Sequence, residues 1–134
     1  MLARIVAVIV ISLVSLPAFA LDACFTDSVG TWRGPVLNGT GLQILDTEFH
    51  LQSDGTLAGT YHVHDVPPFD GSLSGFHETG QCEADFTWQD HFGTGVVHIR
   101  FDPELGRFLG AWGAKTPIPS LLFDGFRRAP PAVS

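Results

Sequence analysis

The side chains best suited to contact a ligand recur at one position of a short repeated pattern. In five copies of this pattern a glycine is followed, two positions later, by a large or charged residue: Trp32, Tyr61, His77, Trp112 and Arg127. Residues two apart in an extended strand share one face, so each copy predicts a glycine and a large side chain on the same face. Glycine weakens a strand interior, and its repeated use here indicates tight curvature or close packing around a shared interior.

Four aromatic residues are the best candidates for the walls of a binding pocket. Ligand pockets are mostly apolar and contain a few placed polar groups. The predicted walls are Trp32, Tyr61, Trp88 and Trp112. His77 and Arg127 are the predicted polar contacts. A competing interpretation is that these rings only fill a core, which aromatic side chains do well because each buries a large area.

Two histidines, His62 and His64, have a spacing that could serve metal binding. They share one face of a predicted strand, and imidazole is a common ligand of zinc and copper. Asp65, His77 and Glu78 could complete a site if the neighbouring strand paired in register. The apolar face of the same strand contains Leu57, Gly59, Tyr61 and Val63. Because this alternation turns both histidines toward solvent, they are weak candidates, and the sequence predicts no metal or other cofactor.

Signatures of catalysis are sparse. The sequence contains no nucleophile elbow, phosphate-binding loop or paired metal motif. His77-Glu78 and Asp90-His91 join unlike titratable groups, but consecutive strand residues point to opposite faces. No catalytic residue is predicted, and an isomerase or lyase that acts in a barrel mouth is the lesser alternative.

Residues 65–70 suggest a further class of function, a binding or inhibitor module that docks on an exported protein partner. Two prolines in this segment precede Phe69, which is predicted to lie at the tip of a loop. Aromatic residues dominate interface hot spots, and loops often carry function. Phe69 could equally fold back over the end of the barrel.

The elements that must position these residues are short strands. From Thr31 onward, apolar-patterned runs alternate with turn residues, which is typical of an all-β meander. The candidate strands are 29–35, 41–51, 56–65, 72–78, 82–91, 95–102, 107–113 and 120–127. Because antiparallel strands with one apolar face remove their edges by closing, we predict a single eight-stranded up-and-down β-barrel, with a two-sheet β-sandwich as the alternative. Such a barrel is filled by side chains or holds one small ligand.

The first twenty residues have the form of a secretory signal peptide. Arg4 precedes an apolar run that ends in small residues at Ala20, and this run is too short to span a bilayer. Cleavage after Ala20 would leave one domain, residues 21–134, with a frayed tail at 129–134. The formal net charge of −7 disfavours nucleic acid as a partner. We expect a periplasmic or secreted protein without a membrane span, and no oligomeric state is predicted.

Two cysteines, Cys24 and Cys82, are predicted to form a disulfide in the oxidising compartment that the signal peptide implies. Closing a loop of this length would stabilise the fold by about 4 kcal/mol. An alternative is that residues 21–24 form a lipoprotein cleavage box, which would attach a lipid to Cys24 and leave Cys82 unpaired. Asp22 is a poor residue inside such a box.

Several of these patterns together resemble the avidin family of the calycin superfamily. The resemblance spans most of residues 29–128 and includes Gly-Thr-Trp at 30–32, Asp-Gly-Thr-Leu-Ala-Gly-Thr-Tyr at 54–61 and Leu-Gly-Ala-Trp at 109–112. Calycins pair the tryptophan of the first strand with an arginine after the last, which implies a contact between Trp32 and Arg127 or Arg128.

The same resemblance carries the biotin site over only in part. Tyr61 matches the family's tyrosine, Trp88 could stand for one wall tryptophan, and Trp112 is a looser match for another. The polar residues that should follow Trp32 are replaced by residues 33–35, Arg-Gly-Pro, and His98 and Arg100 occupy the strand where a tryptophan is expected. The resemblance therefore implies the barrel without biotin recognition. We expect an exported barrel that binds a small, partly apolar molecule in its mouth.

Overall fold

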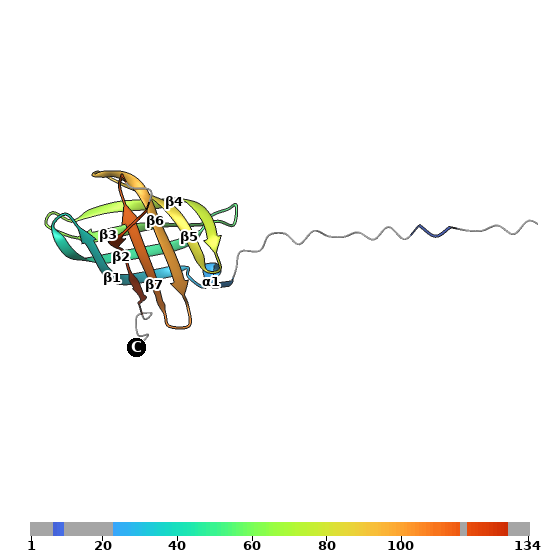
Figure 1. The fold of residues 1–134 in the computed structure, drawn as a ribbon. Helices are drawn as coiled ribbons and strands as arrows, with labels where there is room; N and C mark the ends of the chain where they lie inside the picture. Colours follow the sequence, from blue (N-terminus) through green and yellow to red (C-terminus); the bar gives the residue numbers. More distant parts are fainter. Residues whose placement is uncertain (1–6, 10–22, 116–117, 129–134) are drawn as a thin grey trace, which may run out of the picture.

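The structure is a computed structural model that describes residues 7–9, 23–115 and 118–128. One short helix and nine strands follow one another along the chain (Figure 1): α1 (Ala23–Thr26), β1 (Gly30–Asn38), β2 (Gly41–Leu51), β3 (Leu57–His64), β4 (Phe69–Gly80), β5 (Glu83–Asp90), β6 (Gly93–Asp102), β7 (Arg107–Gly113), β8 (Leu121–Leu122) and β9 (Gly125–Arg127). The predicted signal peptide, apart from residues 7–9, and the predicted tail at 129–134 lie outside the described residues. Within the described residues, no helix is long and apolar enough to cross a membrane.

The strands form a closed antiparallel barrel. Each strand from β1 to β7 pairs with the next, and β9 pairs with both β7 and β1 to close the ring. The eight-stranded barrel predicted from the sequence is therefore confirmed, and the sandwich alternative is wrong because the ring of strands closes.

The ninth strand arises because the last predicted strand is divided in two. At the division, the backbone N–H of Asp124 donates to the carbonyl of Pro35, 3.0 Å away. The side chain of Asp124 accepts the N–H of Gly110, also at 3.0 Å, where a regular strand would offer a backbone carbonyl. A side chain thus replaces one rung of the ladder, and β8 and β9 flank the gap.

Aromatic side chains fill much of the barrel and lie close to glycines on neighbouring strands. Phe49 pairs with Gly59, Tyr61 with Gly71, Trp88 with Gly95 and Phe108 with Gly125. In each pair, a Cβ on the glycine would meet the partner's ring at closer than ordinary contact. Close packing against aromatic rings is therefore one reason for glycine at these strand positions.

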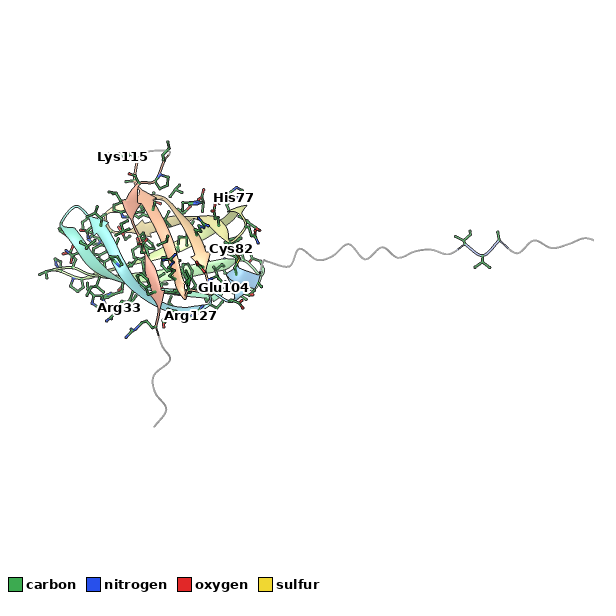
Figure 2. The ribbon with its side chains drawn as sticks, turned by 60° about the horizontal axis from the view of Figure 1, so that its bottom comes forward. Arg33, His77, Cys82, Glu104, Lys115 and Arg127 are labelled. Atoms are coloured by element: carbon green, nitrogen blue, oxygen red, sulfur yellow. A yellow bond between two sulfur atoms is a disulfide. The ribbon has the colours of Figure 1, made fainter. Side chains whose placement is uncertain are left out.

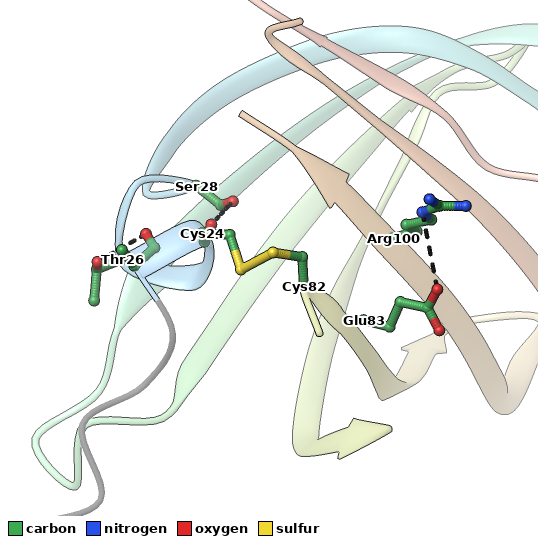
Figure 3. The surroundings of a disulfide bond; sticks show 7 residues. Cys24, Thr26, Ser28, Cys82, Glu83 and Arg100 are labelled. Atoms are coloured by element: carbon green, nitrogen blue, oxygen red, sulfur yellow. Dashed lines mark hydrogen bonds and ion pairs between the residues drawn. A yellow bond between two sulfur atoms is a disulfide. The ribbon is translucent and has the colours of Figure 1, made fainter. Parts of the chain in front are cut away.

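Helix α1 packs at one end of the barrel, where β4 meets β5. Phe25 of α1 is fully buried, and its ring packs edge-on against Phe76 and Phe101, at 5.1 and 5.8 Å between ring centroids. The disulfide joins Cys24 of α1 to Cys82 in the β4–β5 turn, with Cα atoms 5.6 Å apart (Figure 3). The predicted disulfide is thus confirmed, and it leaves no free thiol on Cys24 for the alternative lipid attachment. We call this the closed end.

Candidate ligand site at the open end of the barrel

A cavity of about 290 Å³ lies at the opposite end, which we call the open end. Antiparallel order brings the β1–β2 turn, the β3–β4 loop, the β5–β6 turn and the segment after β7 together there. Figure 2 shows Lys115, which follows β7, on the far side of the barrel from Glu104 in the β6–β7 turn. The described lining residues are Val36, Asn38, Gly39, Thr40, Tyr61, Val63, Asp65, Phe69, Trp88, Asp90, Phe92, Trp112 and Phe123.

Tyr61 forms one wall by crossing a neighbouring strand. Its ring, on β3, lies over Gly71 of β4, where any Cβ would overlap the ring. The hydroxyl then donates a hydrogen bond of 2.6 Å to Asp90 Oδ2 at the end of β5. Burial, followed by this bond to Asp90, raises the pKa of the Tyr61 phenol far above its usual range. The phenol therefore stays protonated and acts as a donor within the wall.

Trp88 repeats this construction two strands further round the barrel. Its indole, on β5, lies against Gly95 of β6, and its Nε1–H donates to the carbonyl of Gly113 on β7 at 3.0 Å. Trp112 of β7 continues the series, since its Nε1–H donates to the carbonyl of Leu37 on β1 at 2.9 Å. The two indoles meet edge-to-face, with centroids 5.3 Å apart. The three rings thus form a belt in which each polar atom already has a partner in the protein.

The polar part of the lining comes from the turns beside the belt. Asp65 Oδ2 accepts from the Thr40 hydroxyl at 2.7 Å and from Asn38 Nδ2 at 3.2 Å, while Oδ1 accepts from the N–H of Val66 at 2.7 Å. The bond from Thr40, with the bond from Val66 next in importance, lowers the pKa of Asp65. Asp65 is therefore ionised at neutral pH.

Asp90 is held in a similar way at the other side of the lining. One carboxylate oxygen accepts from Tyr61, and the other accepts from the N–H of Phe92 at 2.8 Å. Every described donor to Asp65 and Asp90 is thus a neutral group. The described lining contains two carboxylates and no Lys, Arg or His side chain.

The structure gathers three of the six predicted ligand contacts. Tyr61, Trp88 and Trp112 line one cavity. Trp32 is also an inner residue but is fully buried outside this cavity, and its Nε1–H donates to the carbonyl of Ser28 at 3.0 Å. Trp32 is therefore not a wall of this cavity, and it lies beside the segment that joins α1 to β1.

Arg127 is not a polar contact of the cavity either. Its guanidinium lies over the Trp32 ring, with Cζ 4.3 Å from the ring centroid. It also donates to the carbonyls of Val29 and Asp27. Arg127 is therefore the arginine that contacts the first-strand tryptophan. Its contacts lie in a part of the barrel remote from the open end.

His77 faces solvent, which contradicts its predicted place in the interior. The pairing of β4 with β5 shifts between Ser74 and His77, and Gly75 in this interval has a φ of +64°. The irregularity breaks the alternation of faces, so that Phe76 packs against the core and His77 is exposed.

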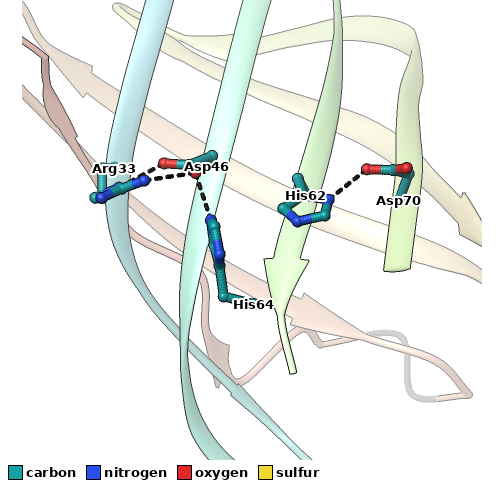
Figure 4. Close-up of polar contacts among 5 residues, drawn as sticks. All are labelled: Arg33, Asp46, His62, His64 and Asp70. Carbon is teal, nitrogen blue, oxygen red and sulfur yellow. Dashed lines mark hydrogen bonds and ion pairs between the residues drawn. The ribbon is translucent and has the colours of Figure 1, made fainter. Parts of the chain in front are cut away.

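The two weak metal candidates lie on the outer face, as their alternation predicts. His62 Nδ1 contacts Asp70 and His64 Nε2 contacts Asp46, each at 2.6 Å, and Asp46 is shared with Arg33 (Figure 4). Each imidazole thus has its own carboxylate partner. Among the residues that the structure describes, no group of three or more His, Cys, Asp or Glu side chains is placed to hold a metal ion.

Phe69 does not form an exposed loop tip. It begins β4, lines the cavity, and packs against His91 and Phe92 at 5.2 and 5.0 Å between ring centroids. Of the two possibilities left open by the sequence, the structure therefore has Phe69 folded over the end of the barrel. The exposed apolar residues nearby are Val66 and Phe92.

Several lining residues were not predicted from the sequence. The sequence offers Asp65 as a possible metal ligand and Asp90 as a titratable neighbour of His91, but it singles out neither of them, nor Asn38 or Thr40, as a cavity residue. The available signal was their shared position: each stands at a strand end that an up-and-down barrel brings to the same rim. Phe123 lies between β8 and β9, so its place in the lining could not be predicted from a single continuous last strand.

A comparison of the chain with protein-family models, with curated proteins and with solved structures finds no significant match in any of the three.

Proposed function

We propose that this chain is an exported binding protein of the calycin type that takes up one small, mostly apolar molecule in the cavity at the open end. The observation that carries the proposal is the belt formed by Tyr61, Trp88 and Trp112. Because its polar atoms are paired within the protein, the walls are formed in advance and a ligand need not order them.

The size and lining of the cavity support the same proposal. Its volume of about 290 Å³ lies near the lower end of the roughly 300–1,000 Å³ typical of ligand pockets. The rest of the interior is packed with buried apolar side chains, such as Phe86, Val97 and Phe108. An aromatic-lined space beside such a core is suited to a ligand with a flat or compact apolar body.

The compartment is supported by the disulfide. A bond between Cys24 and Cys82 persists in oxidising surroundings such as the periplasm or the extracellular space. This agrees with the secretory signal expected in the first twenty residues.

The proposal is tested by filling the cavity. Val63 is buried and lines it, so Val63→Phe should occupy the space that the ligand needs. The melting temperature should stay near that of the parent protein, because the added ring enters empty volume. Val97→Phe in the packed core is the contrast, and it should cost about 1–3 kcal/mol of stability by overpacking.

Binding is read in the same variants by a thermal-shift screen of small apolar molecules. Compounds that stabilise the parent protein should have no effect on Val63→Phe. They should still stabilise Val96→Phe, which adds the same ring to the outer face of β6. Equal stabilisation of Val63→Phe and the parent would refute the cavity as the binding site, as would a large loss of stability in Val63→Phe without any bound compound.

A further inference from the structure

The charges of the cavity narrow the class of ligand, on the assumption that the proposed function holds. Asp65 and Asp90 are the acidic side chains of the described lining. The ion pairs of the described residues involve other carboxylates, such as Asp46 and Glu83. The lining therefore presents negative charge that no described basic side chain neutralises.

The hydrogen-bonding capacity of the lining points the same way. The hydroxyl of Tyr61 and the indole N–H groups of Trp88 and Trp112 each donate to an acceptor in the protein. Asn38 Nδ2 donates to Asp65. The Thr40 hydroxyl has Asp65 and Asn38 as acceptors, at 2.7 and 2.6 Å. A carboxylate can accept about four hydrogen bonds, whereas Asp65 accepts three and Asp90 two from described donors. Most of the hydrogen-bonding capacity that remains for a ligand is therefore acceptor capacity on these two carboxylates.

We propose that the cavity binds an organic cation, a protonated amine on a small apolar body, with its N–H groups donated to the carboxylates of Asp65 and Asp90. The apolar body lies against the belt of Tyr61, Trp88 and Trp112. Aromatic faces also attract cations, so the walls and the carboxylates favour the same charge. The net charge of −7 on the whole chain adds a long-range attraction for cations.

The same arrangement disfavours acids, including fatty acids and biotin. A ligand carboxylate would bring a further negative charge beside two others and would find no described basic partner in the lining. Lys115 and His91 lie near the open end but are not lining residues. They are the groups that could help an acid at the rim.

The test uses matched ligands that differ only in the polar group. The purified chain, with its disulfide intact, is titrated by calorimetry at pH 7 with 2-phenylethylamine, 2-phenylethanol and 3-phenylpropionate. The corresponding indole and hexyl compounds form two further sets. Within a set, the amine should bind about tenfold or more tightly than the alcohol, because hydrogen bonds between charged groups are the stronger ones. The acid should show no measurable binding.

Variants then locate the charge. Asp65→Asn and Asp90→Asn should each weaken amine binding about tenfold while changing alcohol binding much less. Asp70→Asn is the matched control, since Asp70 is on the outer face beside His62. It should leave amine binding unchanged.

Each outcome decides a different claim. If alcohols or acids bind as tightly as the amines and lose binding in Val63→Phe, the amine inference is overturned while the proposed cavity function stands. If none of the nine compounds binds, the amine inference is overturned, and the stability of Val63→Phe still judges the cavity. If acids bind best and Lys115→Gln abolishes that binding, the rim rather than the two carboxylates selects the ligand, and the inference is wrong.

Discussion

At the scale of single residues, the candidate site depends on glycines as much as on aromatic rings. Tyr61 reaches Asp90 across β4 only because residue 71 has no Cβ, and Trp88 lies against Gly95 on its way to β7. The glycine and the ring are one structural unit, because a methyl group at either glycine would occupy the volume of the ring.

Gly71→Ala should therefore damage both stability and the cavity. The new Cβ would overlap Tyr61 Cζ and displace the ring, which breaks the bond to Asp90. The expected cost is about 1–3 kcal/mol in urea unfolding. Gly39→Ala is the control, because a Cβ there has no atom within 4 Å, and it should change stability by less than about 0.5 kcal/mol. Equal stability of the two variants would contradict the role given to Gly71.

A second residue-scale prediction concerns the outer face and its pH dependence. Hydrogen bonds from Arg33, and less strongly from His64, lower the pKa of Asp46 well below its usual range (Figure 4). A folded-state pKa below the unfolded value means that the native state binds fewer protons. The ionised Asp46 side chain therefore makes its full contribution to the free energy of unfolding above the unfolded pKa of about 3.9. This contribution is lost as the pH falls below that value toward the folded-state pKa.

Asp46→Asn should accordingly lower the melting temperature slightly at pH 7. The further fall in melting temperature between pH 7 and pH 3 should be smaller in this variant than in the parent protein. The effect is small because Arg33 is exposed and solvent screens the pair. Glu48→Gln, on the outer face of the same strand, is the control for loss of one negative charge. An Asp46→Asn melting curve that follows the parent protein at every pH would show that the pair contributes nothing.

At the scale of elements, the two ends of the barrel are built differently. The closed end contains α1, the disulfide and the contact of Phe25 with Phe76 and Phe101. The open end contains the belt and the two carboxylates. Damage at one end should therefore leave the other functional as long as the barrel remains folded.

Removing the disulfide tests this separation. The double variant Cys24→Ala with Cys82→Ala releases α1 from the β4–β5 turn and should cost about 2–4 kcal/mol in chemical unfolding. Hydrogen exchange should increase first in α1 and in the turn near Cys82. Ligand affinity at the open end should not change below the unfolding transition. A loss of affinity in the fully folded variant would mean that the ends are coupled.

Much of this fold can be predicted because the alternation of inward and outward residues is visible within each strand's own sequence. The alternation in 82–91 and 95–102 places Phe86 and Trp88, and Val97 and Ile99, on the inner face, where the structure has them. The predicted turn before residue 72 extended too far, because β4 already begins at Phe69. The first residues of β4 pair in register with β3, from Phe69 opposite Val63 to Leu73 opposite Gly59.

The site is less predictable because it depends on position along the barrel axis. Trp32 and Trp88 both face inward, yet only Trp88 lines the cavity, and alternation cannot separate them. The irregular pairing around Gly75 reverses the face of His77 through a backbone φ that the sequence does not specify. Asp65 and Asp90 stand near the ends of different strands, so local sequence spacing does not indicate that they border the same cavity.

At the scale of the whole molecule, the protein is a closed barrel whose open end has a cavity lined by two carboxylates. Its disulfide and packed aromatic interior stabilise the fold, and under the proposed function a ligand would enter without reordering the walls. The three tryptophans can report on binding at different places, because Trp88 and Trp112 line the cavity and Trp32 lies outside it.

The most direct measurement is therefore a nitrogen-15 NMR titration that follows the three indole N–H signals as 2-phenylethylamine is added, with assignments from single Trp→Phe variants. We expect saturable shifts of the Trp88 and Trp112 signals, because their rings form the cavity wall. The signal of Trp32, whose N–H is bonded to Ser28 outside the cavity, should not move. Saturable binding that shifts Trp32, or that leaves both cavity signals in place, would contradict the assignment of the open end as the ligand site.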